Sequence, residues 1–145
     1  MVDPSAVMSV GSCPECGAPQ VDGLGCWEQL GRLIAWEYDD DELRREHFLT
    51  VASYNLQHPA QFTDEAIAGL REAFVDYLDR GISIGEIRRR ASAAPAGAVR
   101  VRRDESARKP VRRSWSMTIA DVYGRGQPNA AECVRRWAAA IRRAL

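Results

Sequence analysis

The chain has 145 residues and no formal net charge, which is long enough for one domain with a sizeable apolar core. It carries four cysteines, no predicted signal peptide, and no apolar run near the ~20 residues needed to span a bilayer. These features exclude a membrane-spanning protein and predict a soluble, cytoplasmic protein with reduced thiols, with disulfides as the weaker interpretation.

The zero net charge conceals two oppositely charged halves. Residues 1–87 contain 16 acidic and 5 basic side chains, whereas residues 88–145 contain 4 acidic and 15 basic ones. Either the acidic half docks against the basic half, or the basic half forms a separate surface for an anionic partner.

The helical pattern begins directly after a flexible lead-in and a cysteine-rich segment. Apolar residues at steps of three and four predict a helix over about 26–38, with Trp27, Leu30, Leu33, Ile34 and Tyr38 on one stripe. The acidic run at 39–42 should cap a second helix, from Glu42 to about Gln57, which Pro59 ends.

Local capping signals define the remaining helices. Thr63 and Gly81 bound the third predicted helix, and Ser83 caps a short fourth one that carries Arg88, Arg89 and Arg90. Residues 91–113 are predicted to be a basic loop. A capping box at 118–121 opens a short helix that Gly124 and Gly126 close, and Pro128 suits the first turn of the last helix. Its predicted core stripe is Val134, Trp137, Ile141 and Leu145.

These elements predict an all-α fold, a bundle of about four to six helices in which an N-terminal zinc knuckle closes on a helical hairpin. We expect one domain over 1–145. It comprises a knuckle segment at 1–25, an acidic helical half at 26–90, the basic loop at 91–113 and a C-terminal helical segment at 114–145.

The chemistry-bearing motif is Cys-Pro-Glu-Cys-Gly at residues 13–17. A Cys-x-x-Cys step followed by glycine lets two thiolates turn onto one ion, as in a zinc knuckle. The chain contains only two histidines, so the two remaining ligands come from a short list: Cys26, His47, His58 and Cys133.

Geometry reduces this list. In one unbroken helix, His47 and His58 would lie roughly 16 Å apart along the axis, so both cannot bind one ion. If the first two helices form an antiparallel hairpin, Cys26 lies beside His58. We therefore predict a zinc site of Cys13, Cys16, Cys26 and His58.

Each of these residues also has a structural interpretation. Cys26 can be a small buried residue at the start of its helix, and His58 can bond the end of the second helix. For His47, a partly buried histidine bonded to the first helix is favoured over a ligand or a base. Cys133 is interpreted as core packing.

Four protein ligands would make the site closed and structural, whereas three ligands and a water would permit catalysis. His47 and Tyr54 are the candidate pocket residues for that alternative, although Tyr54 also fits a core position with its hydroxyl at the edge. The sequence has no HExxH motif, glycine-rich phosphate loop or nucleophile elbow.

The basic region between Arg88 and Arg113 contains ten basic residues and is followed by Trp115, so a protein or nucleic-acid partner is a candidate. A solvated arginine-rich loop is the simpler interpretation. The candidate anion-binding residues are Arg88, Arg89, Arg90, Arg102, Arg103, Arg112 and Arg113.

Four segments carry a resemblance to a known family: Cys-Pro-Glu-Cys-Gly-Ala (13–18), Gly-Cys-Trp (25–27), His-Phe-Leu-Thr-Val-Ala-Ser-Tyr-Asn-Leu-Gln-His-Pro (47–59) and Met-Thr-Ile-Ala-Asp-Val (117–122). The chain resembles, almost end to end, a family of small bacterial proteins classed as a domain of unknown function. The resemblance implies that Cys13, Cys16, Cys26 and His58 act as a group, and it gives His47 more weight. Family members often carry a further histidine where this chain has none, between Ala66 and Tyr77.

The sequence therefore favours a small helical protein with a structural zinc and a non-catalytic binding or accessory role. The alternative is a small zinc-dependent enzyme of hydrolase or lyase type with an open metal position.

Overall fold

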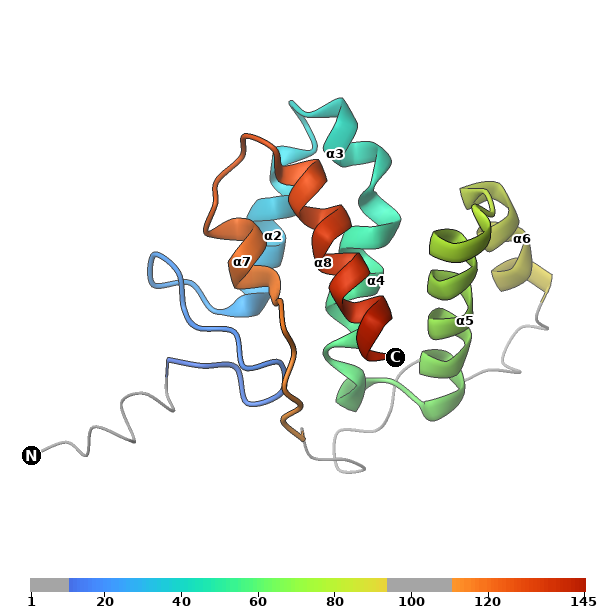
Figure 1. Cartoon of the computed structure of the whole chain (residues 1–145), viewed down its shortest axis with the longest axis horizontal. Helices are drawn as coiled ribbons and strands as arrows, with labels where there is room; N and C mark the ends of the chain where they lie inside the picture. The colour runs from blue at the N-terminus through green and yellow to red at the C-terminus, as the bar shows by residue number, and fades with distance from the viewer. Residues whose placement is uncertain (1–10, 94–110) are drawn as a thin grey trace, which may run out of the picture. The chain divides into compact units, whose positions relative to one another are not determined.

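The computed structural model describes residues 11–93 and 111–145 (Figure 1). The described chain forms two compact units, one of residues 11–57 and 111–145 and one of residues 58–93. The single domain predicted over 1–145 stays a prediction. The helices are α2 (Cys26–Trp36), α3 (Asp41–Arg45), α4 (His47–Leu56), the 3-10 turn η1 (Pro59–Gln61), α5 (Asp64–Arg80), α6 (Ile84–Ala93), α7 (Ile119–Tyr123) and α8 (Ala130–Ala144).

The predicted helical fold class is confirmed, since the described residues form seven α-helices and no strands. The seven helices exceed the predicted four to six because one predicted helix is broken in two. None of the helices in the described ranges is both long enough and apolar enough to cross a bilayer.

The core of the first unit is organised by α8, which packs against α3, α4 and α7, while α2 packs against α7 (Figure 1). Val134, Trp137 and Ile141 are buried as predicted, but Leu145 is only half-buried at the C-cap. The expected position of Pro128 in the first turn was wrong. The helix begins two residues later, after Asn129, whose left-handed φ of 63° separates the turn from the helix.

Two side-chain contacts show that α2 and α4 run antiparallel, although α2 packs mainly against α7. At one end, the Trp27 ring at the start of α2 lies 6.0 Å from the Tyr54 ring near the end of α4. At the other end, Glu37 at the C-cap of α2 bonds to His47 at the start of α4. The first residue of α2 and the residues that follow α4 are thereby brought to the same end.

The single helix expected over 42–57 was wrong, because the chain breaks at Glu46 (φ −94°, ψ 15°) into α3 and α4. The acidic run does cap α3, through the Asp40 carboxylate that accepts from Leu43 N at 3.0 Å. Leu43 and Leu49 are six residues apart and would lie about 120° apart around a continuous helix. The break allows both side chains to be buried in the core.

The predicted apolar stripe of α2 was wrong at its two ends. Leu30 and Leu33 are buried, whereas Trp27 is 67% and Tyr38 is 89% exposed. Tyr38 lies beyond the last helical residue, Trp36, so it no longer follows the helical stripe.

The short α7 begins as the capping box predicts. The backbone N–H of Thr118 donates to the Asp121 carboxylate at 2.8 Å. Gly124 follows the helix as its C-cap.

The second unit follows its local signals closely. Thr63 caps α5 by accepting from Ala66 N at 3.2 Å, and Gly81 ends it in the left-handed region at φ 66°. Ser83 Oγ accepts from Glu86 N at 3.0 Å at the start of α6. The two helices are joined by an ion pair of Arg90 with Asp76 at 2.7 Å.

The predicted basic loop over 91–113 was wrong at its start, because α6 continues to Ala93. Residues 94–110 lie outside the described residues. Residues 111–113 are not helical.

Candidate metal centre

The knuckle is a compact turn that directs backbone N–H groups at two sulfur atoms. Cys13 N donates to Ala18 O and Gly17 N donates to Cys13 O, each at 2.9 Å. Gly17 takes φ +80°, which an L side chain rarely adopts, so glycine suits the turn. The N–H groups of Glu15 and Cys16 approach Cys13 Sγ at 3.5 and 3.4 Å, and Ala18 N approaches Cys16 Sγ at 3.4 Å.

A buried amide fixes the loop between the knuckle and α2. Gln29 is fully buried, and its Nε2 donates to Pro19 O at 3.1 Å and to Leu24 O at 2.9 Å. These two bonds hold both sides of the loop against the helix that begins with Cys26. Sequence reasoning missed Gln29, and only its position on the face of Leu33 could have indicated that it is buried.

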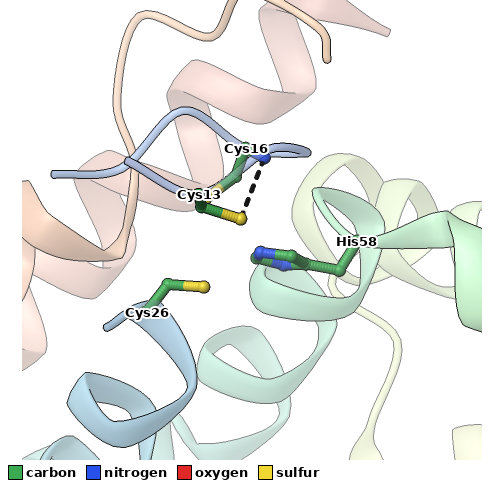
Figure 2. A group of neighbouring side chains, drawn as sticks. All are labelled: Cys13, Cys16, Cys26 and His58. Carbon is green, nitrogen blue, oxygen red and sulfur yellow. Dashed lines mark hydrogen bonds between the residues drawn. The ribbon is translucent and has the colours of Figure 1, made fainter. Parts of the chain in front are cut away.

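Cys13, Cys16, Cys26 and His58 converge, and their ligand atoms all lie within 4.8 Å of one another. Figure 2 shows the Cys13 and Cys26 thiols and the His58 imidazole ring turned toward one another, with Cys16 beside Cys13. In a tetrahedral site with Zn–S bonds of about 2.3 Å, two sulfurs lie about 3.8 Å apart. The four side chains could therefore hold a metal ion after only small side-chain movements.

The ligand atoms come from three separate parts of the chain. Cys13 and Cys16 lie on the knuckle, Cys26 is the first residue of α2, and His58 follows the C-cap residue of α4. Cys16 and His58 are buried, at 2% and 6% exposure. A metal ion bound in this pocket would therefore lose most of its hydration water.

The cluster disfavours thiolates unless a cation is bound among them. The hydrogen bond with Cys26, together with burial, raises the pKa of the Cys16 thiol above its ordinary value. Several thiolates cannot be held together in a buried place without a positive charge among them. A metal ion supplies that charge and is bound by the thiolate form of cysteine.

Gln57 anchors the segment that presents His58. Its Nε2 donates to Met117 O at 2.8 Å, and its Oε1 accepts from Trp137 Nε1 at 3.2 Å. Both side chains of the latter pair are almost fully buried. The residue before the imidazole is thus tied to α8 and to the segment before α7, and nothing local in the sequence indicates either bond.

Tyr54 lies beside the cluster. Its hydroxyl is 3.5 Å from Cys26 Sγ, and the residue is only 3% exposed. Burial, followed by the hydrogen bond with Cys26, raises the pKa of the Tyr54 phenol above its ordinary value. Tyr54 therefore stays a neutral hydroxyl at the edge of the site, at a core position.

His47 and Cys133 lie outside the four-residue cluster. As expected, His47 is bonded to the first helix of the hairpin: its Nδ1 lies 2.8 and 2.9 Å from the two Glu37 carboxylate oxygens. The side chain of His47 is 52% exposed and that of Glu37 is nearly buried. Cys133 is buried on α8, as predicted for a core residue.

The candidate anion-binding arginines are scattered over several environments. On α6, Arg89 pairs with Glu86 and Arg90 pairs with Asp76, and Arg88 is exposed. Arg102 and Arg103 lie outside the described residues.

Two of these arginines flank the knuckle. The Arg112 guanidinium lies so close to Gly17 that an added Cβ would meet it at 3.0 Å. Arg113 N donates to Glu15 O of the knuckle at 3.3 Å. The Arg113 guanidinium lies 4.3 Å above the centre of the Trp115 ring and donates to Ala144 O at 2.6 Å.

The comparisons with known proteins give one match. Neither a curated protein nor a solved structure matches the chain. A family model described as "Family of unknown function (DUF5946)" matches residues 11–145. The resemblance to a family of unknown function is thus confirmed, and the chain belongs to this family.

Proposed function

We propose that the protein binds one zinc ion through Cys13, Cys16, Cys26 and His58, and that this ion has a structural role. The observation that carries the proposal is the convergence of four ligand atoms within 4.8 Å of one another. We further propose a non-catalytic binding or accessory role for the folded protein, which a closed site without a water position supports.

The donor set favours zinc over the hard cations. Thiolate and imidazole ligands suit zinc, whereas magnesium and calcium prefer carboxylate, carbonyl and water oxygens. Three cysteines and one histidine form a common structural zinc set with tetrahedral geometry. Iron also accepts a sulfur-rich tetrahedral site, so the identity of the metal is a matter for elemental analysis.

The surroundings of the ligands favour a closed site. Cys13 and Cys16 receive backbone N–H groups of the knuckle, and a phenol hydroxyl lies next to Cys26. Hydrogen bonds to a metal-bound thiolate hold it in place and lower its reactivity. The ion would join the knuckle, the start of α2 and the end of α4, which supports a structural staple.

The test is elemental analysis of purified protein, followed by the visible spectrum after cobalt substitution. We expect one zinc per chain and a spectrum of four-coordinate cobalt with three thiolate ligands. A cobalt site with an exchangeable water would instead support the zinc-dependent enzyme. A protein without any stoichiometric metal would overturn the proposal.

We also propose that the basic region over 88–113 contacts an anionic macromolecule. Its support is the charge asymmetry of the sequence together with Arg112 and Arg113, which are exposed and lie beside Gly17 and Glu15 of the knuckle. Binding to single-stranded and duplex oligonucleotides should weaken as salt rises. Absence of binding at low salt would remove nucleic acid as the partner.

A further inference from the structure

We propose that Tyr54 is a positioning residue of the metal site, whose hydroxyl donates a hydrogen bond to the metal-bound thiolate of Cys26. The inference rests on the proposed function, because it assigns a role at the same site. Its observations are the 3.5 Å distance between Tyr54 Oη and Cys26 Sγ and the near-complete burial of Tyr54.

The direction of the hydrogen bond follows from the chemistry of the bound state. Either the thiol or the phenol could be the donor in the metal-free pair. A cysteine that binds a metal has lost its proton, so only the phenol retains one to donate. The Tyr54 hydroxyl lies 3.5 Å from Cys26 Sγ, so its proton can point at the sulfur.

Tyr54 also links two parts of the site. It lies on α4, 28 residues from Cys26, and four residues before His58 in the chain. The same end of α4 thus leads to one ligand and supplies a donor to another. The Trp27 ring, on the residue after Cys26, lies 6.0 Å from the Tyr54 ring at a tilt of 56°.

The physical effect of the bond is on the sulfur electrons. A donor stabilises the negative charge on the thiolate, so the sulfur is a weaker nucleophile and is less easily protonated. Loss of a partner that orients a ligand typically lowers metal affinity about 10-fold to 100-fold. We expect a Tyr54→Phe variant to lose about tenfold, since it removes one hydrogen bond and keeps the ring.

The experiment compares full-length wild-type protein with Tyr54→Phe, and with Tyr38→Phe as the control, since Tyr38 is 89% exposed on the same hairpin. Zinc affinity is measured by competition with a chelator. Alkylation by iodoacetamide is mapped onto each cysteine by mass spectrometry. In the cobalt-substituted proteins, the energy of the thiolate-to-cobalt charge-transfer band is recorded.

In Tyr54→Phe we expect weaker zinc binding, faster alkylation at Cys26 than at Cys13 or Cys16, and a charge-transfer band at longer wavelength. The band moves because a thiolate without a donor gives up its electron more easily. A general loosening of the fold would expose all the cysteines and would not shift the band in the folded cobalt protein.

Site-specific replacement of Tyr54 by 3-fluorotyrosine keeps the shape and strengthens the donor, so the band should move to shorter wavelength. This variant provides the test even if Tyr54→Phe does not fold. If the wild type binds zinc but neither change at Tyr54 shifts the band, the inference is wrong and the proposed function stands. If the wild type binds no metal, both are overturned.

Discussion

The two units of the protein differ in the interactions that stabilise each of them internally. The first unit buries an apolar core around Leu33, Leu43, Leu49 and Trp137, and contains three of the four cluster residues. In the second unit, the residues whose burial is described, 58–92, include only three buried ones, His58, Phe74 and Asp76. Its helices depend on caps and on ion pairs instead.

This difference predicts distinct sensitivities. The first unit should respond to metal removal and to core substitutions, and the second to backbone substitutions and to pH. All four tryptophans, at positions 27, 36, 115 and 137, lie in the first unit, so tryptophan fluorescence reports on that unit alone. Hydrogen exchange of α5 reports on the second unit.

The largest effect is expected from removal of the metal, by a chelator or by Cys16→Ser. Structural zinc supplies on the order of 10 kcal/mol to small domains, which is comparable with the whole stability of a typical domain. We expect α2 and α4 to lose protection from hydrogen exchange, whereas α5 keeps its protection. If a chelated sample retains full protection in α2 and α4, the ion is not structural.

The next effect is expected from Trp137→Ala in the zinc-saturated protein. The change removes a fully buried ring and leaves Gln57 Oε1 without its indole donor. The free energy of unfolding of the first unit should fall by about 3–5 kcal/mol. Urea unfolding followed by the remaining tryptophans measures it.

Tyr38→Ala is the control for this substitution, because Tyr38 is 89% exposed. It should change the free energy of unfolding by less than about 0.5 kcal/mol. An equal loss in both variants would contradict the assignment of Trp137 to the core of the first unit.

Two glycines of the second unit should respond in opposite directions to alanine. At Gly81, with φ 66°, a Cβ meets no atom within 4 Å, so only backbone strain acts, and the cost is about 1–2 kcal/mol. At Gly69, inside α5 and equally open, alanine should stabilise the helix by about 0.5–1 kcal/mol. Hydrogen exchange of α5 measures both changes, and the same sign at both positions would refute the explanation.

The smallest effect is expected from acid on the ion pairs of the second unit. The Arg90 guanidinium holds the pKa of Asp76 below its ordinary value. The contribution of this pair is therefore fully present above the ordinary carboxyl pKa of ~3.9, and it is lost as pH falls through the lower folded-state pKa.

Asp76→Asn should weaken α5 protection at neutral pH and remove this part of the acid dependence. Glu72→Gln, an exposed change on the same helix, is the control. Unchanged acid dependence in Asp76→Asn would show that another group is responsible.

The sequence by itself determined the elements whose signals are local. The ends of α5 follow from Thr63 and Gly81, because a cap bonds residues no more than a few positions away. The Cys-x-x-Cys step likewise predicts a metal knuckle, because its two ligands are only three positions apart. The proximity of Cys26 and His58 followed from the hairpin, since two antiparallel helices return the chain to its starting end.

Tertiary packing decided the remaining features. The break at Glu46 lets both Leu43 and Leu49 enter the core, a choice that helical periodicity cannot reveal. The bond from Trp137 to Gln57 spans 80 residues of sequence, and that between Tyr54 and Cys26 spans 28. Buried polar groups must find partners wherever the fold places them, so their pairing is fixed only when the helices have packed.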